Sequence, residues 1–429
     1  MLKLRRAIVM HAGPPDGSEQ ELTIELGGCA RRAIADIALV GVVQARDEVI
    51  VNTQALDLGL GSGGFDVVHA NLTRGLQGDP SPLAPSPADS IPTNPAIKLN
   101  YTSIQHAVSP VEDERVPELP LRKPVAVLGL HGQLAPVAWA FAEALAGARL
   151  GYVQTEGGAL PGGHSRTVRS LRASGLLAGH LTAGAAFGGE GEAITTAGAL
   201  HHGLSVLGWD AAVCGPGPGI VGSNSPLGHG GLVALDSAHT ALALGCETLL
   251  VARMSSGDPR ARHRGISHHT LTVLDLLLAP VTVALPAGMR SPVGADLRAG
   301  LGAVFGGGAP SSSRPGIELD VERPARITRH DWRRAVVDLP AYAGSGLPAQ
   351  TMGRSLIEDP LFFGAALAGG AALAGLTRED GQALPVDGVD AEAAGGAGTL
   401  EGDGASDGAE AVIEVGQAGA QERDAKLGV

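Results

Sequence analysis

From about residue 122 onward, the sequence alternates short apolar runs with amphipathic segments, and this alternation restricts the fold more than any other feature. The apolar runs lie at 124–130, 149–155, 180–187, 210–216, 247–253 and 280–286. Strands that are apolar along their whole length are typical of a parallel sheet that helices cover on both faces. Because crossovers between parallel strands are right-handed, the pattern predicts a doubly wound, mostly parallel, Rossmann-like α/β sheet.

The first part of the chain has a different pattern. In residues 1–75, Val, Ile and Thr alternate with polar residues between turns of Gly and Asp, as is typical of half-buried antiparallel strands. We therefore expect a small antiparallel, barrel-like β domain there. Residues 76–95 are dense in Pro and Ser and predict an extended linker.

The Rossmann-like α/β domain is expected to span residues 96–376. Towards its end we expect a helix within 288–308, a strand at 316–322 and a last helix at 359–376. The tail that remains, 377–429, is acidic and rich in Gly and Ala, with almost no aromatic or large aliphatic side chain. Such a composition predicts disorder.

Charge and composition exclude some partners. The chain has 31 Lys and Arg against 44 Asp and Glu, a formal charge of -13, and no sustained basic stripe, so we expect no nucleic-acid partner. The start, "MLKLRRAIVMHAG", has too short an apolar core for a signal peptide. The run at 271–286 contains Asp275 and two prolines and is shorter than a membrane span of about 20 residues.

These patterns, together with 3 widely spaced cysteines that do not suggest a disulfide framework, predict a cytoplasmic protein with no membrane partner. Helical surfaces rich in Ala and Gly would allow subunits to pack closely, so a homodimer is compatible with the sequence.

Polar residues follow most of the expected strands. His131 and Gln133 come after the first strand, and His164 precedes the helix that follows the second. In an open parallel sheet, ligands bind beyond the carboxyl ends of the strands, where helix N-termini present free backbone N–H groups. A single histidine near a strand end is more often a hydrogen-bonded structural residue than a ligand, so these residues count only as members of one shared edge.

A glycine-rich loop follows the fourth strand. It contains Gly215, Gly217, Gly219, Gly222 and Ser223. Such a turn between a buried strand and a helix lets backbone amides close on a phosphate or carboxylate. The spacing is neither a Walker motif nor a dinucleotide fingerprint, and a tight structural turn is the alternative.

The stretch after the fifth strand, "SSGDPRARHRGISHHT" at 255–270, is the most polar of these loops. Asp258, His263 and His268 offer a carboxylate and two imidazoles, which are usual ligands of zinc, iron or manganese. Such a divalent ion with an open position would activate water for hydrolysis.

The same loop permits two other interpretations. Arg260, Arg262 and Arg264 could clamp an anion beside the helix N-terminus, with a histidine as general acid or base. Alternatively, the loop is solvated and does no chemistry, with Ser267 as the N-cap of the next helix.

Six stretches together resemble a bacterial family known as domain of unknown function 3866. They are "NTQALDLGLGSGGFDVVHANL", "IKLNYTSIQHAV", "LGLHGQLAPVA", "GPGPGIVGS", "DPRARHRGISHHT" and "TMGRSLIEDPLFF". The resemblance runs from about residue 3 to residue 375, leaves the tail outside, and implies a soluble bacterial protein without assigning a catalytic residue. Locally, "HRGISH" is similar to the His-Arg-Gly-x-Thr-His pattern of membrane-bound metal-dependent hydrolases, with Ser267 in place of the threonine.

Two functions follow from these observations. The first is a hydrolase-like enzyme acting on a small anionic metabolite at the sheet edge, in which the glycine-rich loop and the arginines hold the anion. His131, His263 and His268 would then carry proton transfer or a metal ion. The second is a module that senses a ligand, or acts as a scaffold, through the same pocket without turnover.

Overall fold

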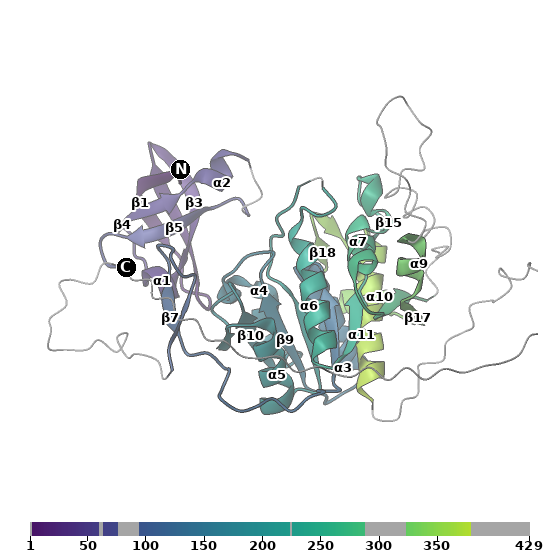
Figure 1. Ribbon diagram of the computed structural model, residues 1–429. Coiled ribbons are helices and arrows are strands. Elements are labelled where there is room, and N and C mark those ends of the chain that lie inside the picture. Colours follow the sequence, from purple (N-terminus) through teal and green to yellow (C-terminus); the bar gives the residue numbers. More distant parts are fainter. Residues whose placement is uncertain (1, 60–62, 76–93, 224, 288–322, 379–429) are drawn as a thin grey trace, which may run out of the picture. The chain divides into compact units, whose positions relative to one another are not determined.

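The computed structural model describes residues 2–59, 63–75, 94–223, 225–287 and 323–378. It contains a closed five-stranded barrel and an eight-stranded sheet with helices (Figure 1). The expected fold class, a small β domain followed by a Rossmann-like α/β sheet, is confirmed. The helix expected within 288–308, the strand at 316–322, and nearly all of the linker and the tail lie outside the described residues, and the domain boundaries stay predictions.

The barrel consists of β1 (Leu4–Ala12), β2 (Glu19–Leu26), β3 (Cys29–Asp36), β4 (Glu48–Asn52) and β5 (Asp66–Asn71). Every second residue of β2 faces the interior, where Leu22 and Ile24 pack with Val49 and Val51. The strands close in the order β1-β2-β3-β5-β4, and all pairs are antiparallel except β3 with β5. That parallel pair departs from the expected antiparallel pattern.

The large sheet consists of β8 (Pro124–Leu128), β9 (Leu150–Thr155), β10 (Gly179–Ala183), β11 (Gly191–Ala193), β12 (Ala211–Pro216), β13 (Glu247–Val251), β16 (Thr282–Pro286) and β17 (Asp331–Ala335). Their order is β11-β10-β9-β12-β8-β13-β16-β17, and every neighbouring pair is parallel. All six expected strands are present. The two edge strands were not expected, because β11 is only three residues long and the sequence of β17, "DWRRA", is not an apolar run.

Helices cover both faces of this sheet. They are α3 (Leu134–Ala144), α4 (Arg166–Ala173) and α11 (Pro360–Thr377) on one face, and α5 (Thr196–His201), α6 (Val233–Ala243) and α7 (His268–Leu276) on the other. Alternate residues of β8 contribute to the two cores: Val125 and Val127 pack with α5, α6 and α7, whereas Ala126 and Leu128 pack with α3 and α4. Burial on both faces explains why these strands lack polar alternation.

Smaller elements connect or flank these layers. They are α1 (Ile37–Val40), α2 (Gln54–Asp57), α9 (Arg323–Thr328), α10 (Leu339–Gly344), and the strand pairs β6 (Ala96–Lys98) with β7 (His106–Val108), β14 (Met254–Ser255) with β15 (Gly265–Ile266), and β18 (Gln350–Thr351) with β19 (Arg354–Ser355). The expected last helix is present as α11.

The helix α11 is long and apolar enough to span a membrane by composition, and among the described helices it alone meets that test. However, 72% of its apolar window is buried inside the protein, where Phe362, Phe363 and Leu367 pack against Tyr342 and Ala140. Its apolar character is therefore that of a core helix.

The direction in which the chain crosses the sheet reverses at its centre. From β8 the chain proceeds to β9, β10 and β11 on one side and returns to β12, which lies between β9 and β8. It then continues through β13, β16 and β17 on the other side of β8. Right-handed crossovers in opposite directions place the helices on opposite faces. The loops after β8, β12 and β13 therefore open into the crevice where such sheets bind ligands.

The close packing of Trp209 against β9 allows a test of the fold. A Cβ atom on Gly151 would lie 1.9 Å from the indole of Trp209, a fully buried side chain. We expect Gly151→Ala to lower the free energy of unfolding by about 3 kcal/mol, because this overpacking cannot be relieved at the surface. Urea denaturation would measure the loss. Gly375→Ala is the matched control: a Cβ there meets nothing within 4 Å, so the same substitution in helix α11 should be neutral or mildly stabilising.

Candidate functional site

A cavity of about 200 Å³ lies at the carboxyl ends of β8, β12 and β13. It is lined by Leu130, Ile220, Val221, Gly222, Ser223, His229, Arg253, Arg260, Arg262, His263, His269 and Met352. Three loops that are far apart in the sequence, together with the turn between β18 and β19, thus contribute to one wall. Its polar side is cationic and imidazole-rich, and its apolar side is made of Leu130, Ile220, Val221 and Met352.

The loop 252–267 folds back on itself and brings its histidine to the helix that follows. Met254–Ser255 pairs with Gly265–Ile266 in a short antiparallel ladder, and Gly265 has φ +65°, which favours glycine. Ser267 then caps α7, because its Oγ accepts a hydrogen bond from the backbone N–H of His269. The N-cap expected from the sequence is therefore present.

Four imidazoles meet at this point. Ring centroids are 4.8 Å apart for His263 and His268, 4.3 Å for His268 and His269, and 4.9 Å for His263 and His269. His229, from the loop after β12, stacks on His269 at 3.5 Å. His263, His268 and His229 are buried and His269 is half-buried.

The environment keeps these imidazoles neutral. Burial, and then the positive charge of Arg253, lowers the pKa of His263 to about 3. Burial followed by the charge of Arg262 lowers the pKa of His268 to about 4. The pKa of His269 and that of His229 are lowered for the same first reason. Each ring therefore keeps one nitrogen lone pair at neutral pH.

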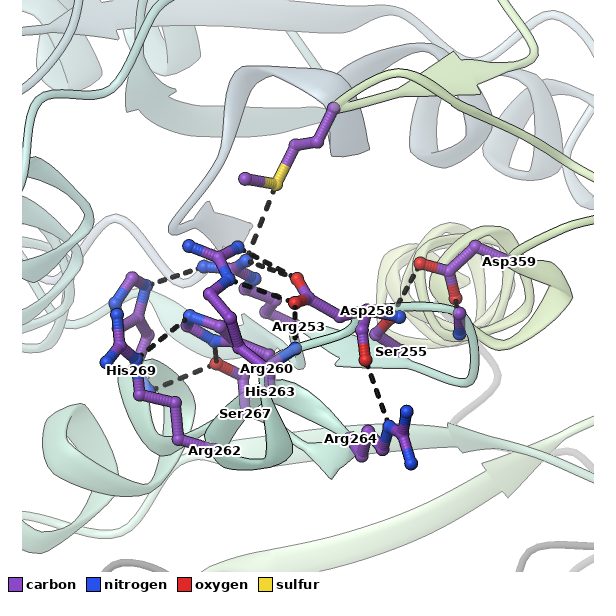
Figure 2. A network of polar contacts seen from close by, with 12 residues as sticks. Arg253, Ser255, Asp258, Arg260, Arg262, His263, Arg264, Ser267, His269 and Asp359 are labelled. Atoms are coloured by element: carbon purple, nitrogen blue, oxygen red, sulfur yellow. Dashed lines mark hydrogen bonds and ion pairs between the residues drawn. The ribbon is translucent and has the colours of Figure 1, made fainter.

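A buried carboxylate organises the arginines around the cavity (Figure 2). Asp258 is fully buried and accepts two hydrogen bonds from Arg260, from Nε at 2.9 Å and from Nη2 at 2.8 Å. Arg354 Nη2 lies 3.5 Å from the same carboxylate, and Arg253 Nη2 lies 3.7 Å from it. Burial alone would raise the pKa of Asp258, but the hydrogen bonds and charge of Arg260 hold it well below its usual range.

A second buried carboxylate, Asp359 at the start of α11, fixes the beginning of the same loop. It accepts hydrogen bonds from Ser255 Oγ at 2.6 Å, from the backbone N–H of Ser256 at 2.8 Å and from Arg354 Nε at 3.0 Å. Arg354 thus joins the two carboxylates. Arg354 and Asp359 therefore hold the loop in place beside the start of α11.

Arg253 is the buried cation nearest the imidazoles. It is 4% exposed, its Nη1 donates to His269 Nδ1 at 2.8 Å, and its Nη2 lies 3.5 Å from Met352 Sδ. Burial, together with the neighbouring charge of Arg260, lowers its pKa to about 10, so the guanidinium stays charged at neutral pH. Since Arg260 already engages both oxygens of the Asp258 carboxylate, that carboxylate offsets the charge of Arg253 only from 3.7 Å.

The structure brings together only part of the residue set expected from the sequence. Arg260, Arg262, His263, Gly222 and Ser223 line the cavity, and His268 contacts the lining histidines. Asp258 does not belong to the group of imidazoles that could hold a metal ion, and its carboxylate is hydrogen-bonded by guanidiniums. Arg264 is exposed and donates to the backbone oxygen of Asp258 at 3.0 Å.

Three other expected residues make structural contacts instead of lining the cavity. His131 is buried, with Nε2 2.8 Å from Ser165 Oγ and Nδ1 3.2 Å from the carbonyl oxygen of Pro216, and burial lowers its pKa to about 4. Gln133 donates to the carbonyl oxygen of Ala252 at 3.1 Å. His164 Nε2 lies 3.3 Å from the carboxylate of Asp36.

The glycines of the loop after β12 divide into two roles. Gly215 and Gly217 allow close packing, since a Cβ would lie 2.7 Å from Leu128 Cβ in the first case and 2.3 Å from the carbonyl oxygen of Ala159 in the second. Gly219 has φ +73° and turns the chain. Gly222 reaches the cavity.

Sequence reasoning missed Arg253 and His229 and gave His269 no role. Arg253 ends an apolar run and was assigned to the strand, although a charged residue at the carboxyl end of a buried strand is itself a signal. His229 follows the glycine-rich loop, in which the glycines and Ser223 were the candidate residues. Their proximity to His263 depends on three loops meeting, which no local pattern encodes.

The fold and the cavity together define a Rossmann-like α/β protein that carries a cationic, histidine-rich pocket at the reversal point of its sheet. The family model described as "Protein of unknown function (DUF3866)" matches residues 32–370, and the chain belongs to this family. No curated protein and no solved structure matches the chain.

The buried state of Asp258 leads to a second test. We expect Asp258→Asn to lower the free energy of unfolding by about 3 kcal/mol at pH 7, because it leaves partly buried guanidiniums without their carboxylate. The pKa of Asp258 is lower in the folded state than in the unfolded state. The carboxylate therefore contributes its full stabilisation of the fold above the unfolded pKa of about 3.9, and this stabilisation is lost as the pH falls through the folded-state pKa. The free energy of unfolding should be measured for both proteins from pH 7 to pH 3. The difference between wild type and variant should become smaller only below about pH 4, and a difference that stays constant over the whole range would contradict the assignment.

Proposed function

We propose that the cavity binds a small anionic metabolite and that the protein is an enzyme of the hydrolase class. The observation that carries the proposal is the position of Arg253, a buried guanidinium on the wall of the cavity. Its nearest carboxylate, Asp258, lies 3.7 Å away and already holds Arg260 in a bidentate pair. A buried charge needs a partner of opposite sign, and an anion in the cavity would supply it.

The volume of the cavity favours a small ligand. About 200 Å³ is below the range of roughly 300–1,000 Å³ that is usual for drug-sized ligands. Arg260 and Arg262 line the same space, and planar guanidiniums suit the oxygens of a phosphate or carboxylate. The apolar side, with Leu130 and Val221, would accommodate a short carbon chain.

The imidazoles support a hydrolytic role. In hydrolysis of an ester, water adds to the carbonyl carbon or the phosphorus, the bond to the leaving oxygen breaks, and a proton passes from the water to the leaving group. His263 and His268, whose neutral imidazoles keep a lone pair, would either accept and return that proton or hold a metal ion that activates the water. His131 is not given this role, because its ring is hydrogen-bonded away from the cavity.

Binding can be tested with two arginines of one loop. Arg262→Met removes a guanidinium that lines the cavity, whereas Arg264→Met removes one from the exposed side of the same loop. We expect metal-free wild-type protein to bind inorganic phosphate in calorimetric titrations and Arg262→Met to lose at least about tenfold in affinity, since a hydrogen bond to a charged group contributes about 1.5–3 kcal/mol. Equal affinities of the two variants would contradict the proposed pocket.

Turnover distinguishes an enzyme from a ligand sensor. We expect the wild-type chain to hydrolyse members of a panel of small phosphate and carboxylate esters, and His263→Ala to abolish this activity while the circular dichroism spectrum is retained. Phosphate binding without hydrolysis of any ester in the panel would contradict the hydrolase proposal and favour the sensing module.

A further inference from the structure

We propose that His263, His268 and His269 form a binding site for a divalent transition metal ion of the zinc type. The inference deepens the proposed function and rests on it for the anion that would balance the charge of the ion. All three residues come from one short segment: His263 ends the turn before α7, and His268 and His269 are the first two residues of that helix.

The distances within the cluster suit such an ion. One nitrogen from each of the three rings lies within 4.8 Å of the others. In a tetrahedral zinc site with Zn–N bonds of about 2.0–2.1 Å, the ligand nitrogens are about 3.4 Å apart. Each ring nitrogen would therefore move by about 1 Å or less, which a small rotation of the ring provides.

Unsatisfied nitrogens point to a ligand at the same place. His268 is 4% exposed, and its Nε2 is buried without a hydrogen-bond partner among the described residues. Both ring nitrogens of the neighbouring His229 are in the same condition. Buried polar atoms in proteins are nearly always hydrogen-bonded, so several unpartnered nitrogens within one cluster of imidazoles call for a group that accepts lone pairs.

The surroundings orient at least one ring for this role. The Nδ1 of His263 lies 2.8 Å from Ser267 Oγ, so Nε2 would be its ligand atom. Nε2 now accepts a hydrogen bond from Arg262 Nε at 3.5 Å, and this side chain would have to turn away. A hydrogen bond to the second nitrogen of a ligating histidine is the usual way in which proteins fix the ring. A set of three imidazoles without a carboxylate favours zinc, or another ion that prefers nitrogen, over magnesium or calcium.

The buried positive charge of Arg253 disfavours a metal ion beside it, so metal binding should depend on whether an anion occupies the cavity. Its Nη1 donates to His269 Nδ1 at 2.8 Å, so that nitrogen becomes free only when the guanidinium turns away. An anion in the cavity would draw Arg253 toward itself and offset its charge. Metal and anion should therefore raise each other's affinity, since such coupling is reciprocal.

The first experiment measures metal binding to the full chain after treatment with chelator. We expect one Zn²⁺ per chain in calorimetric titrations, and Co²⁺ should give the intense visible absorption of a four-coordinate site. His268→Gln and His263→Gln should each lower the Zn²⁺ affinity by at least about tenfold. His11→Gln, at an exposed position of β1, is the matched control and should bind as wild type does.

Thermal unfolding in the presence of chelator verifies that each variant is folded before its affinity is compared. The proposal is overturned if folded His268→Gln binds Zn²⁺ as tightly as wild type, or if Co²⁺ keeps the spectrum of the hydrated ion.

The second experiment tests the coupling with sulfate as the anionic probe. The Zn²⁺ affinity of wild type should rise when sulfate is present, and that of Arg262→Met should not; an unchanged wild-type affinity would overturn the coupling. The zinc titration without sulfate and the phosphate titration without metal are independent, so failure of the metal site and failure of the anion pocket are distinguishable.

Discussion

The carboxylate of Asp258 is the interaction on which the pocket depends. It is fully buried and lies within 4.0 Å of the guanidiniums of Arg253, Arg260 and Arg354. Burying several guanidiniums without a carboxylate would cost several kcal/mol for each charge. With the carboxylate present, the loop after β13 can hold arginines beside a cluster of neutral imidazoles. Asp258 offsets the charge of the guanidiniums that contact it, while other guanidinium charge on the loop still lines the cavity.

The backbone places that loop where a ligand can reach it. Reversal of the crossover direction around β8 opens the crevice. Glycines in the loop after β12 let the backbone pack closely against the neighbouring segments that border it. Gly215 and Gly217 pack where a Cβ would meet Leu128 and Ala159. His131 and Gln133 connect the ends of β8, β12 and β13 by buried hydrogen bonds. These contacts maintain the shape of the cavity, and the arginines and histidines that line it are a different set of residues.

Sequence patterns were sufficient for most of the architecture. Six strands of the parallel sheet and the helix α11 follow from apolar runs, because burial on both faces removes polar alternation. The edge strands did not follow: β17 is partly exposed and reads "DWRRA", so no apolar run marks it. The parallel pairing of β3 with β5 was also missed, because pairing partners are chosen by barrel closure and not by the strands themselves.

The candidate site was predictable only in part. The sequence by itself determined that imidazoles and guanidiniums of 255–270 would stand at the carboxyl edge of a parallel sheet, because strand order along the chain and the direction of each strand fix which loop ends there. Tertiary structure alone decided that Arg253 and His229 lie beside these side chains and that Asp258 binds guanidiniums. It also decided that the His131 ring hydrogen-bonds to Ser165 and Pro216 instead of lining the cavity. Those outcomes depend on which loops meet across the crevice and on how burial balances charge, and both are properties of the folded chain.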